Sequence, residues 1–225
     1  MLELQRKDFN CLTSYAIENI SSIDVDKLKP FFINLPADPY IAGNYRFRRL
    51  SHFEVSDKRV IKLPHRPLYQ PKQYNPLLGD VVREYAELED ELIDLSDFQR
   101  MILEFFEFCE LCSTFKEVSV HQIRTTASPE ETGKPAPEGI HRDGVDLIAI
   151  FSVNRERIEG GETHLYKSKN DSPVLNKILN PGEMLVFGDG EFFHFTSVIN
   201  AISSEGGVRD VFVLTCPGLS LPNNK

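Results

Sequence analysis

Short apolar runs separated by glycine- and proline-rich turns dominate the chain from about residue 117 onward. Turn sequences such as NPGE, GDGE and SSEGG lie between these runs, with no helical stretch among them. Many short strands joined by such turns are typical of sandwiches and jelly-roll barrels. The sequence therefore predicts a mainly β protein with some α structure, built on a jelly-roll or cupin-like double-stranded β-helix. The strand-like runs are 117–126, 146–153, 161–167, 183–188, 192–199 and 208–215.

The first 115 residues have a more mixed pattern. Residues 8–20 are compatible with a short helix. Strict alternation over 44–55 predicts a strand, with Arg46 and Arg48 on one face and Arg49 on the other. We interpret this basic segment as an edge strand of the sheet.

Prolines and helical periodicity organise the next segment. Residues 61–76 contain four prolines and are expected to form an extended loop, one candidate for a lid together with 127–139. Two helices are expected at 77–90 and 97–113. Ser96 and Gln99 have the spacing of a capping box for the second helix.

No linker divides the chain, so we expect a single domain over residues 1–225. Within it, residues 1–115 would form an N-terminal α/β extension whose helices pack on the core. Residues 116–217 would form the double-stranded β-helix itself.

Charge and cysteine content limit the partners and the compartment. The net charge of −9 disfavours a nucleic-acid surface, since phosphate binding needs a basic patch. No run of 18 apolar residues could cross a membrane, and the N-terminus has no signal-peptide core, so a cytoplasmic protein is expected. Cys109 and Cys112 form a CxxC that continues a helical apolar stripe. Core packing is the favoured interpretation, with zinc or redox chemistry as the alternative.

A histidine and an aspartate two residues apart, His141 and Asp143, begin an apolar strand-like run. Alternate residues of a strand face the same way, so the imidazole and the carboxylate would project together. His194, in a later expected strand, is the best candidate for a third ligand. Two histidines and one carboxylate that leave other positions open suit non-haem Fe(II). The alternatives are a surface turn that contains a histidine, or histidines hydrogen-bonded within a β core.

Arg209 begins the last strand-like run, on the same face as Val211, Val213 and Thr215. A buried guanidinium needs a partner, and its planar fork fits a carboxylate. A dicarboxylate co-substrate held between the metal and Arg209 would supply that partner. An ordinary ion pair with Asp210 or Asp189 is the alternative.

These residues, together with the segments around them, resemble the Fe(II)/2-oxoglutarate-dependent dioxygenases. The segments HQIR, PEGIHRDGVD, GGETHLY, NPGEMLVFGDGEFFHFTSVI and RDVFVLT are similar to the bacterial family that includes L-isoleucine 4-hydroxylase. The resemblance is strongest over about residues 117–217. It implies Fe(II) held by His141, Asp143 and His194, 2-oxoglutarate gripped by Arg209, and O2 as oxidant. Many members of the wider superfamily place a serine two residues after the arginine. Val211 stands there, so the second anchor of 2-oxoglutarate must come from elsewhere.

The resemblance implies hydroxylation of a free aliphatic L-amino acid, coupled to decarboxylation of 2-oxoglutarate to succinate. Hydroxylation of a protein side chain is one alternative, and a cupin-like metal sensor without oxygenase activity is another. Arg124 or Gln122 could contact the substrate, although alternation does not say which face of 117–126 points inward. Glu138 or Asp146 could receive an ammonium group. An exposed edge at 46–55 would allow a homodimer, although a helix could equally cover it.

Overall fold

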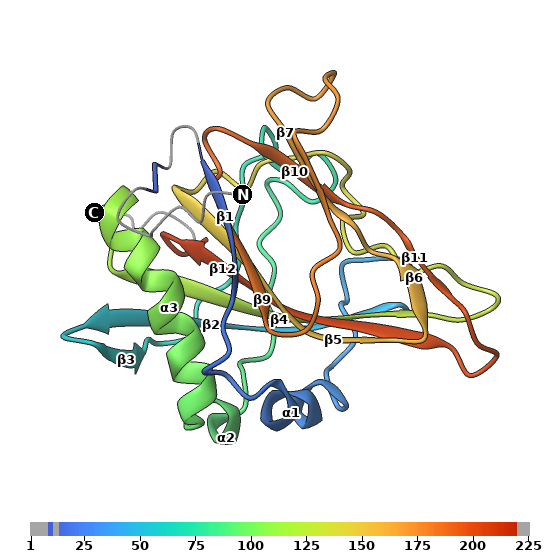
Figure 1. Ribbon diagram of the computed structural model, residues 1–225, viewed down its shortest axis with the longest axis horizontal. Helices are drawn as coiled ribbons and strands as arrows, with labels where there is room; N and C mark the ends of the chain where they lie inside the picture. Colours follow the sequence, from blue (N-terminus) through green and yellow to red (C-terminus); the bar gives the residue numbers. More distant parts are fainter. Residues whose placement is uncertain (1–8, 11–13, 220–225) are drawn as a thin grey trace.

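Three layers make up the structure, a computed structural model that describes residues 9–10 and 14–219 (Figure 1). The middle layer is a seven-stranded antiparallel sheet in the order β1-β9-β5-β12-β4-β2-β3. Strands from both halves of the chain share this sheet, since β1, β2 and β3 precede residue 115. Its strands are β1 (Tyr15–Asn19), β2 (Arg46–Ser56), β3 (Arg59–Lys62), β4 (Glu117–Ala127), β5 (Leu147–Glu156), β9 (Glu183–Gly188) and β12 (Gly207–Cys216).

Helices and smaller sheets cover the two faces of this sheet. The helices lie together on one face in Figure 1. They are α1 (Val25–Leu28), the 3-10 helix η2 (Lys29–Phe32), α2 (Asp90–Ile93) and α3 (Ser96–Cys112). The other side carries a three-stranded sheet in the order β10-β7-β8 and a two-stranded sheet, β11-β6. These strands are β6 (Ile158–Gly160), β7 (Thr163–Tyr166), β8 (Leu175–Lys177), β10 (Phe193–Thr196) and β11 (Ile199–Ala201).

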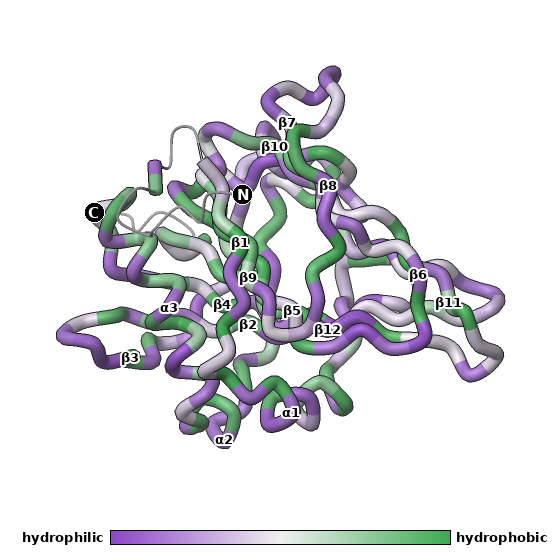
Figure 2. The backbone as a smooth tube through the Cα atoms, in the orientation of Figure 1, coloured by the Kyte–Doolittle hydropathy of each residue, from purple (hydrophilic) through white to green (hydrophobic). Residues whose placement is uncertain are grey.

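Alternation along the strands sorts the apolar side chains into two cores. On β5, Ala149 and Phe151 pack toward the helices, whereas Ile148 and Ile150 pack toward the smaller sheets. Figure 2 shows that hydrophobic and hydrophilic residues alternate in short stretches along the backbone of the strands and of α3. Cys109 is fully buried in the helix-side core. Burial raises the pKa of its thiol, which fits the core interpretation of the CxxC.

The predicted mainly β, jelly-roll fold is confirmed. Each predicted strand-like run overlaps an observed strand, and 183–188 matches β9 at both ends. The run 192–199 is divided between β10 and the first residue of β11. The helix expected at 97–113 is α3, displaced by one residue. Among the described residues, no helix is long and apolar enough to cross a membrane.

Three local predictions in the N-terminal half are wrong. The expected helix at 8–20 falls partly outside the described residues, and its described end is β1, which pairs with β9. Residues 77–89 form turns and extended backbone, and only residue 90 is helical, as the start of α2. The carbonyl of Ala86 accepts from Leu50 of β2, and the backbone of Arg83 pairs with that of Leu68. The capping box is absent, since Leu95 is the N-cap of α3 and Gln99 donates to the carbonyl of Ile93.

The edge expected at 46–55 is not exposed. β2 pairs with β4 along one side, and its end pairs with β3. On its other side, the amide of Arg48 donates to Pro36 and the amide of Leu50 donates to Ala86. The coil segments around residues 36–38 and 86 therefore satisfy this edge, and they remove the feature on which the homodimer prediction depended.

A buried ion pair joins β4 to β12 on the helix-side face of the sheet. Arg124 Nε and Nη2 donate to the two carboxylate oxygens of Asp210, at 2.7 and 2.8 Å. The Asp210 side chain is fully buried, and that of Arg124 is 16 % exposed. Such two-pronged pairing is the favourable geometry for arginine and a carboxylate.

We predict that Arg124→Leu lowers the free energy of unfolding by about 3 kcal/mol, because the Asp210 carboxylate would stay buried without its cation. Urea unfolding followed by circular dichroism measures the change. The matched control is Arg100→Leu on α3, where the exposed guanidinium lies 3.9 Å from Glu104. That loss should stay below about 0.5 kcal/mol. Equal losses in the two variants would contradict the assignment.

Candidate metal centre

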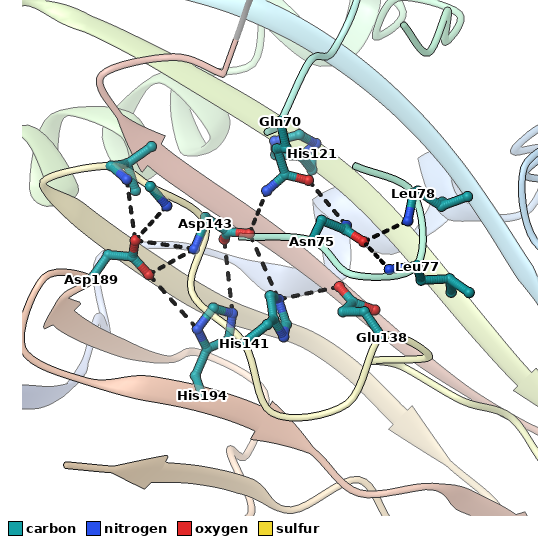
Figure 3. Close-up of polar contacts among 12 residues, drawn as sticks. Gln70, Asn75, Leu77, Leu78, His121, Glu138, His141, Asp143, Asp189 and His194 are labelled. Carbon is teal, nitrogen blue, oxygen red and sulfur yellow. Dashed lines mark hydrogen bonds and ion pairs between the residues drawn. The ribbon is translucent and has the colours of Figure 1, made fainter. Parts of the chain in front are cut away.

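Three side chains with metal-binding donors line the cavity between the large sheet and the smaller sheets. Figure 3 shows them close together. His141, Asp143 and His194 each offer one donor atom, and these atoms lie within 4.8 Å of one another. The backbones of His141 and His194 exchange two hydrogen bonds, of 3.1 and 2.9 Å. This short bridge holds the two imidazoles side by side, although they are far apart in sequence.

Hydrogen bonding and burial leave both imidazoles suited to a metal. His141 Nδ1 lies 2.8 Å from the Gly139 carbonyl, to which it can donate, and this tautomer leaves the lone pair on Nε2. That Nε2 lies 3.7 Å from Asp143 Oδ1, and His194 Nε2 lies 3.8 Å from Asp143 Oδ2. Both separations are too long for hydrogen bonds and leave room for an ion between the donors. Burial, and next the neighbouring His141, lowers the pKa of His194 well below its usual value and favours the neutral ligand form.

A tight turn, and not the strand predicted from the sequence, positions Asp143. The Asp189 carboxylate, just after β9, accepts the backbone N–H groups of Asp143, Gly144 and Val145. Gly144 has φ +85°, and a Cβ there would lie 2.7 Å from the Tyr74 ring, so the turn needs glycine. Burial, and next the charge of Asp143, raises the pKa of Asp189 to about 6.

The proline-rich loop adds a contact to the Asp143 carboxylate that the sequence did not reveal. Gln70 Nε2 donates to Asp143 Oδ1 at 2.7 Å. Gln70 Oε1 accepts from Asn75 Nδ2 at 3.2 Å (Figure 3). It also accepts from Arg83 Nη2 at 2.7 Å. The only sequence signal was the length of this loop, which we interpreted as a lid.

Arg209 lines the same cavity and has no acidic partner among the described residues. It is 5 % exposed and shares the inward face of β12 with Val211, Val213 and Thr215, as predicted. Of its two suggested partners, Asp210 binds Arg124 and Asp189 binds the turn at 143–145. Burial, and next the nearby Arg155, lowers the pKa of Arg209 to about 9.

Thr125 is the residue of β4 directly opposite Arg209 in the strand pairing. Its side chain lines the cavity, and its hydroxyl is buried without a hydrogen-bond partner. Buried hydroxyls in proteins are usually hydrogen-bonded, so this one is available to a ligand beside Arg209.

The four residues suggested for substrate contact do not lie together. Glu138 lines the cavity, with Oε1 3.2 Å from His141 Nε2. Gln122 and Arg124 point to the helix-side face, where Gln122 donates to the Phe31 carbonyl. The alternate residues His121, Ile123 and Thr125 face the cavity instead. Asp146 accepts a hydrogen bond from Ser113 outside the cavity.

Sequence reasoning also missed a group of buried cations in the cavity wall. Arg46 and Arg48 on β2 line the cavity with Arg83, and Asp38 lies among them. Strand alternation had placed Arg46 and Arg48 on one face, but we interpreted the segment as an edge. The presence of Arg46 and Arg48 on the same face of a strand is the sequence feature that could have indicated a buried group of cations.

Two bacterial enzymes are similar to this chain over most of its length. It is 22 % identical to the 3(1)-hydroxy-L-isoleucine 4-dioxygenase of Pantoea ananatis (strain AJ13355) over 199 residues, covering 85 % of this chain and 80 % of that enzyme. It is 24 % identical to the L-isoleucine-4-hydroxylase of Bacillus thuringiensis over 192 residues, covering 82 % and 79 % of the two chains.

The fold also matches a solved structure. The crystal structure of a BsmA homologue from Methylobium petroleophilum PM1 superimposes with a TM-score of 0.82 at 23 % identity. The match covers 100 % of this chain and 97 % of that one. A family model described as 2OG-Fe dioxygenase matches residues 29–215, a span that contains the histidine and aspartate cluster and Arg209. The chain therefore belongs to the 2OG-Fe dioxygenase family, whose cofactors are Fe(II), 2-oxoglutarate and O2.

Proposed function

We propose that this dioxygenase hydroxylates a free aliphatic L-amino acid and releases succinate from 2-oxoglutarate. The observation that carries the proposal is the convergence of three metal donors and the unpaired Arg209 in one cavity. The names of the two enzymes similar to the chain, both acting on isoleucine or a hydroxy derivative of it, support an amino-acid substrate. A cytoplasmic location stays a prediction from the sequence.

In this proposal His141, Asp143 and His194 hold the iron. When bound, the iron supplies the oxidative chemistry, activating O2 as 2-oxoglutarate loses CO2. The protein's residues keep the donors in place. The Gly139 carbonyl orients the His141 ring, Asp189 shapes the turn at Asp143, and Gln70 orients the Asp143 carboxylate.

Arg209 and Thr125 hold the far carboxylate of 2-oxoglutarate. A guanidinium buried without an anion is costly, and a carboxylate bound to it relieves that cost. The Thr125 hydroxyl donates a second hydrogen bond from the facing position on β4, where its oxygen has no other partner. Thr125 would thus supply the anchor that Val211 does not.

The remaining cavity receives the amino acid. Leu68, Leu77 and Leu78 of the loop that follows β3 line it and give an aliphatic side chain an apolar wall. Glu138, close to His141, is the carboxylate placed to receive the substrate ammonium group. Removing water from this space protects the oxidation from side reactions.

We expect succinate release in the presence of Fe(II), 2-oxoglutarate and O2 to be stimulated by one or more aliphatic amino acids from a panel of free L-amino acids. Mass spectrometry should show a product heavier by one oxygen atom. His141→Ala should abolish stimulation, because it removes an iron donor. Stimulation by peptides alone would show instead that the enzyme acts on a protein side chain.

Gln70→Leu should weaken Fe(II) binding by about 10- to 100-fold, since it removes the hydrogen bond that orients Asp143. Anaerobic Fe(II) titration followed by calorimetry measures this change. Gln73→Leu is the matched control, because Gln73 lies in the same loop and is exposed. Equal iron affinity in the Gln70 variant and the control would reject the positioning role.

Arg209→Met should raise the 2-oxoglutarate concentration that gives half-maximal turnover by about 100-fold, and Thr125→Val by about 3- to 10-fold. Thr125→Val also removes a buried hydroxyl that has no partner, so its thermal stability should not fall. Thr126→Val is the control, since Thr126 is the next residue on β4 and faces away from this cavity. An unchanged co-substrate requirement in the Thr125 variant would remove it from the site.

A further inference from the structure

Three arginines and one aspartate form a buried cluster in the cavity wall, which we call the arginine cluster. Arg46, Arg48 and Arg83 are 9 %, 5 % and 2 % exposed, and Asp38 is 5 % exposed. All four side chains line the cavity that contains the metal donors. The cations therefore outnumber the carboxylate three to one in a region largely closed to water.

The pairing inside the arginine cluster is loose. Asp38 Oδ2 lies 3.7 Å from Arg46 Nε and 3.9 Å from Arg48 Nη1, beyond hydrogen-bond distance. This oxygen and the Nε atoms of all three arginines are buried without a hydrogen-bond partner. Asp38 Oδ1 is already bound by the amide of Tyr40 and the hydroxyl of Tyr85. The cluster thus has donor capacity that no protein group satisfies.

Two neutral side chains contact Arg48 and do not balance its charge. The Arg48 guanidinium lies 4.2 Å from the Tyr85 ring centre and contacts His121 Nδ1. Burial, and next the charge of Arg48, keeps the pKa of His121 well below its usual value, so this imidazole is neutral. Burial also lowers the pKa of Arg48. A buried cation without a close anion is unfavourable, so binding of an anion in this pocket would lower the free energy of the protein.

One side chain separates the arginine cluster from the metal donors. Arg83 donates to Gln70 Oε1, and Gln70 donates to Asp143 Oδ1. An anion on Arg83 would therefore lie within one small molecule's length of the iron site. Arg209 and Thr125, the proposed anchor for 2-oxoglutarate, face each other on β12 and β4. Arg46 lies opposite Thr125 on the other side of β4, whereas Arg48 lies farther along β2 and Arg83 lies in the loop that follows β3.

We propose that the arginine cluster binds the α-carboxylate of the amino-acid substrate. This inference rests on the proposed function and adds a selection rule to it. An amino acid inside a peptide has an amide in place of the carboxylate, and an amide cannot neutralise the buried guanidinium groups. The cluster would therefore select free amino acids over peptide-bound residues.

The test uses the protein loaded with Fe(II) and 2-oxoglutarate under anaerobic conditions. Calorimetry measures binding of the amino acid that best stimulates succinate release, and binding of its primary amide. The wild-type protein should bind the amide about 100-fold more weakly. Arg48→Met and Arg83→Met should each weaken binding of the acid by about 10- to 100-fold and leave amide binding nearly unchanged. The 2-oxoglutarate affinity should stay at the wild-type value.

Arg100→Met on the surface of α3 is the matched control and should bind both compounds like wild type. Thermal unfolding separates a binding role from a structural one, because removing an excess buried cation should not lower the melting temperature. Arg48→Lys and Arg83→Lys keep the charge if a methionine variant does not fold, and should lose less affinity for the acid.

Three results would overturn the inference while leaving the proposed function intact. These are equal binding of acid and amide by the wild type, full retention of acid binding in the arginine variants, and loss of 2-oxoglutarate affinity in place of amino-acid affinity. By contrast, the absence of stimulation by any free amino acid would reject the proposed function, and the substrate role of the arginine cluster with it.

Discussion

The buried carboxylate of Asp189 determines where the metal donors can meet. It accepts the N–H groups of three consecutive residues and so bends the chain at Asp143 just before β5 begins. The same carboxylate lies 4.0 Å from His194 Nδ1, on the side of that ring away from Asp143. The Asp189 side chain, just after β9, thus holds the turn at residues 143–145 and also lies beside His194 of β10. Without this contact, the bridge between His141 and His194 would hold two imidazoles but no aspartate.

Around this centre the charges are divided between the walls of the cavity. Asp143 and Glu138 lie at the metal donors, whereas guanidinium groups, with Asp38 as the one carboxylate among them in the described chain, lie on β2, β12 and the loop carrying Arg83. Outside the cavity, Arg124 and Asp210 neutralise each other on the opposite face of the same sheet. Arg124 is thus fully paired and holds two strands together, whereas the cavity arginines have only the loose pairing with Asp38 or, for Arg209, no acidic partner among the described residues. Unpaired charge is tolerated only where a ligand can later compensate for it.

The sequence predicted those parts of the molecule whose local pattern agrees with their tertiary contacts. The strands after residue 117 follow from alternation and turns, and the His141, Asp143 and His194 group follows from residue type and spacing. The pattern did not predict β1, whose five residues are a strand only because β9 lies beside them. It also failed at Arg83, because the expected helix at 77–90 gave no reason to place that residue near Asp143. Alternation defined the two faces of β4 but not which one turns inward, so Arg124 was suggested as a substrate contact although the face with His121 lines the cavity.

The loop after β3 performs two tasks with neighbouring residues. Gln70 is hydrogen-bonded to Asp143, while Leu77 and Leu78 form part of the apolar wall and are tied by their amides to Asn75, a partner of Gln70. Exchanging this loop for that of another enzyme, to accept a larger or smaller substrate, would also remove the hydrogen bond from Gln70 that orients Asp143. Substrate range and iron binding therefore change together when the loop is exchanged. Engineering of the substrate range should vary Leu77 and Leu78 and keep Gln70 and Asn75.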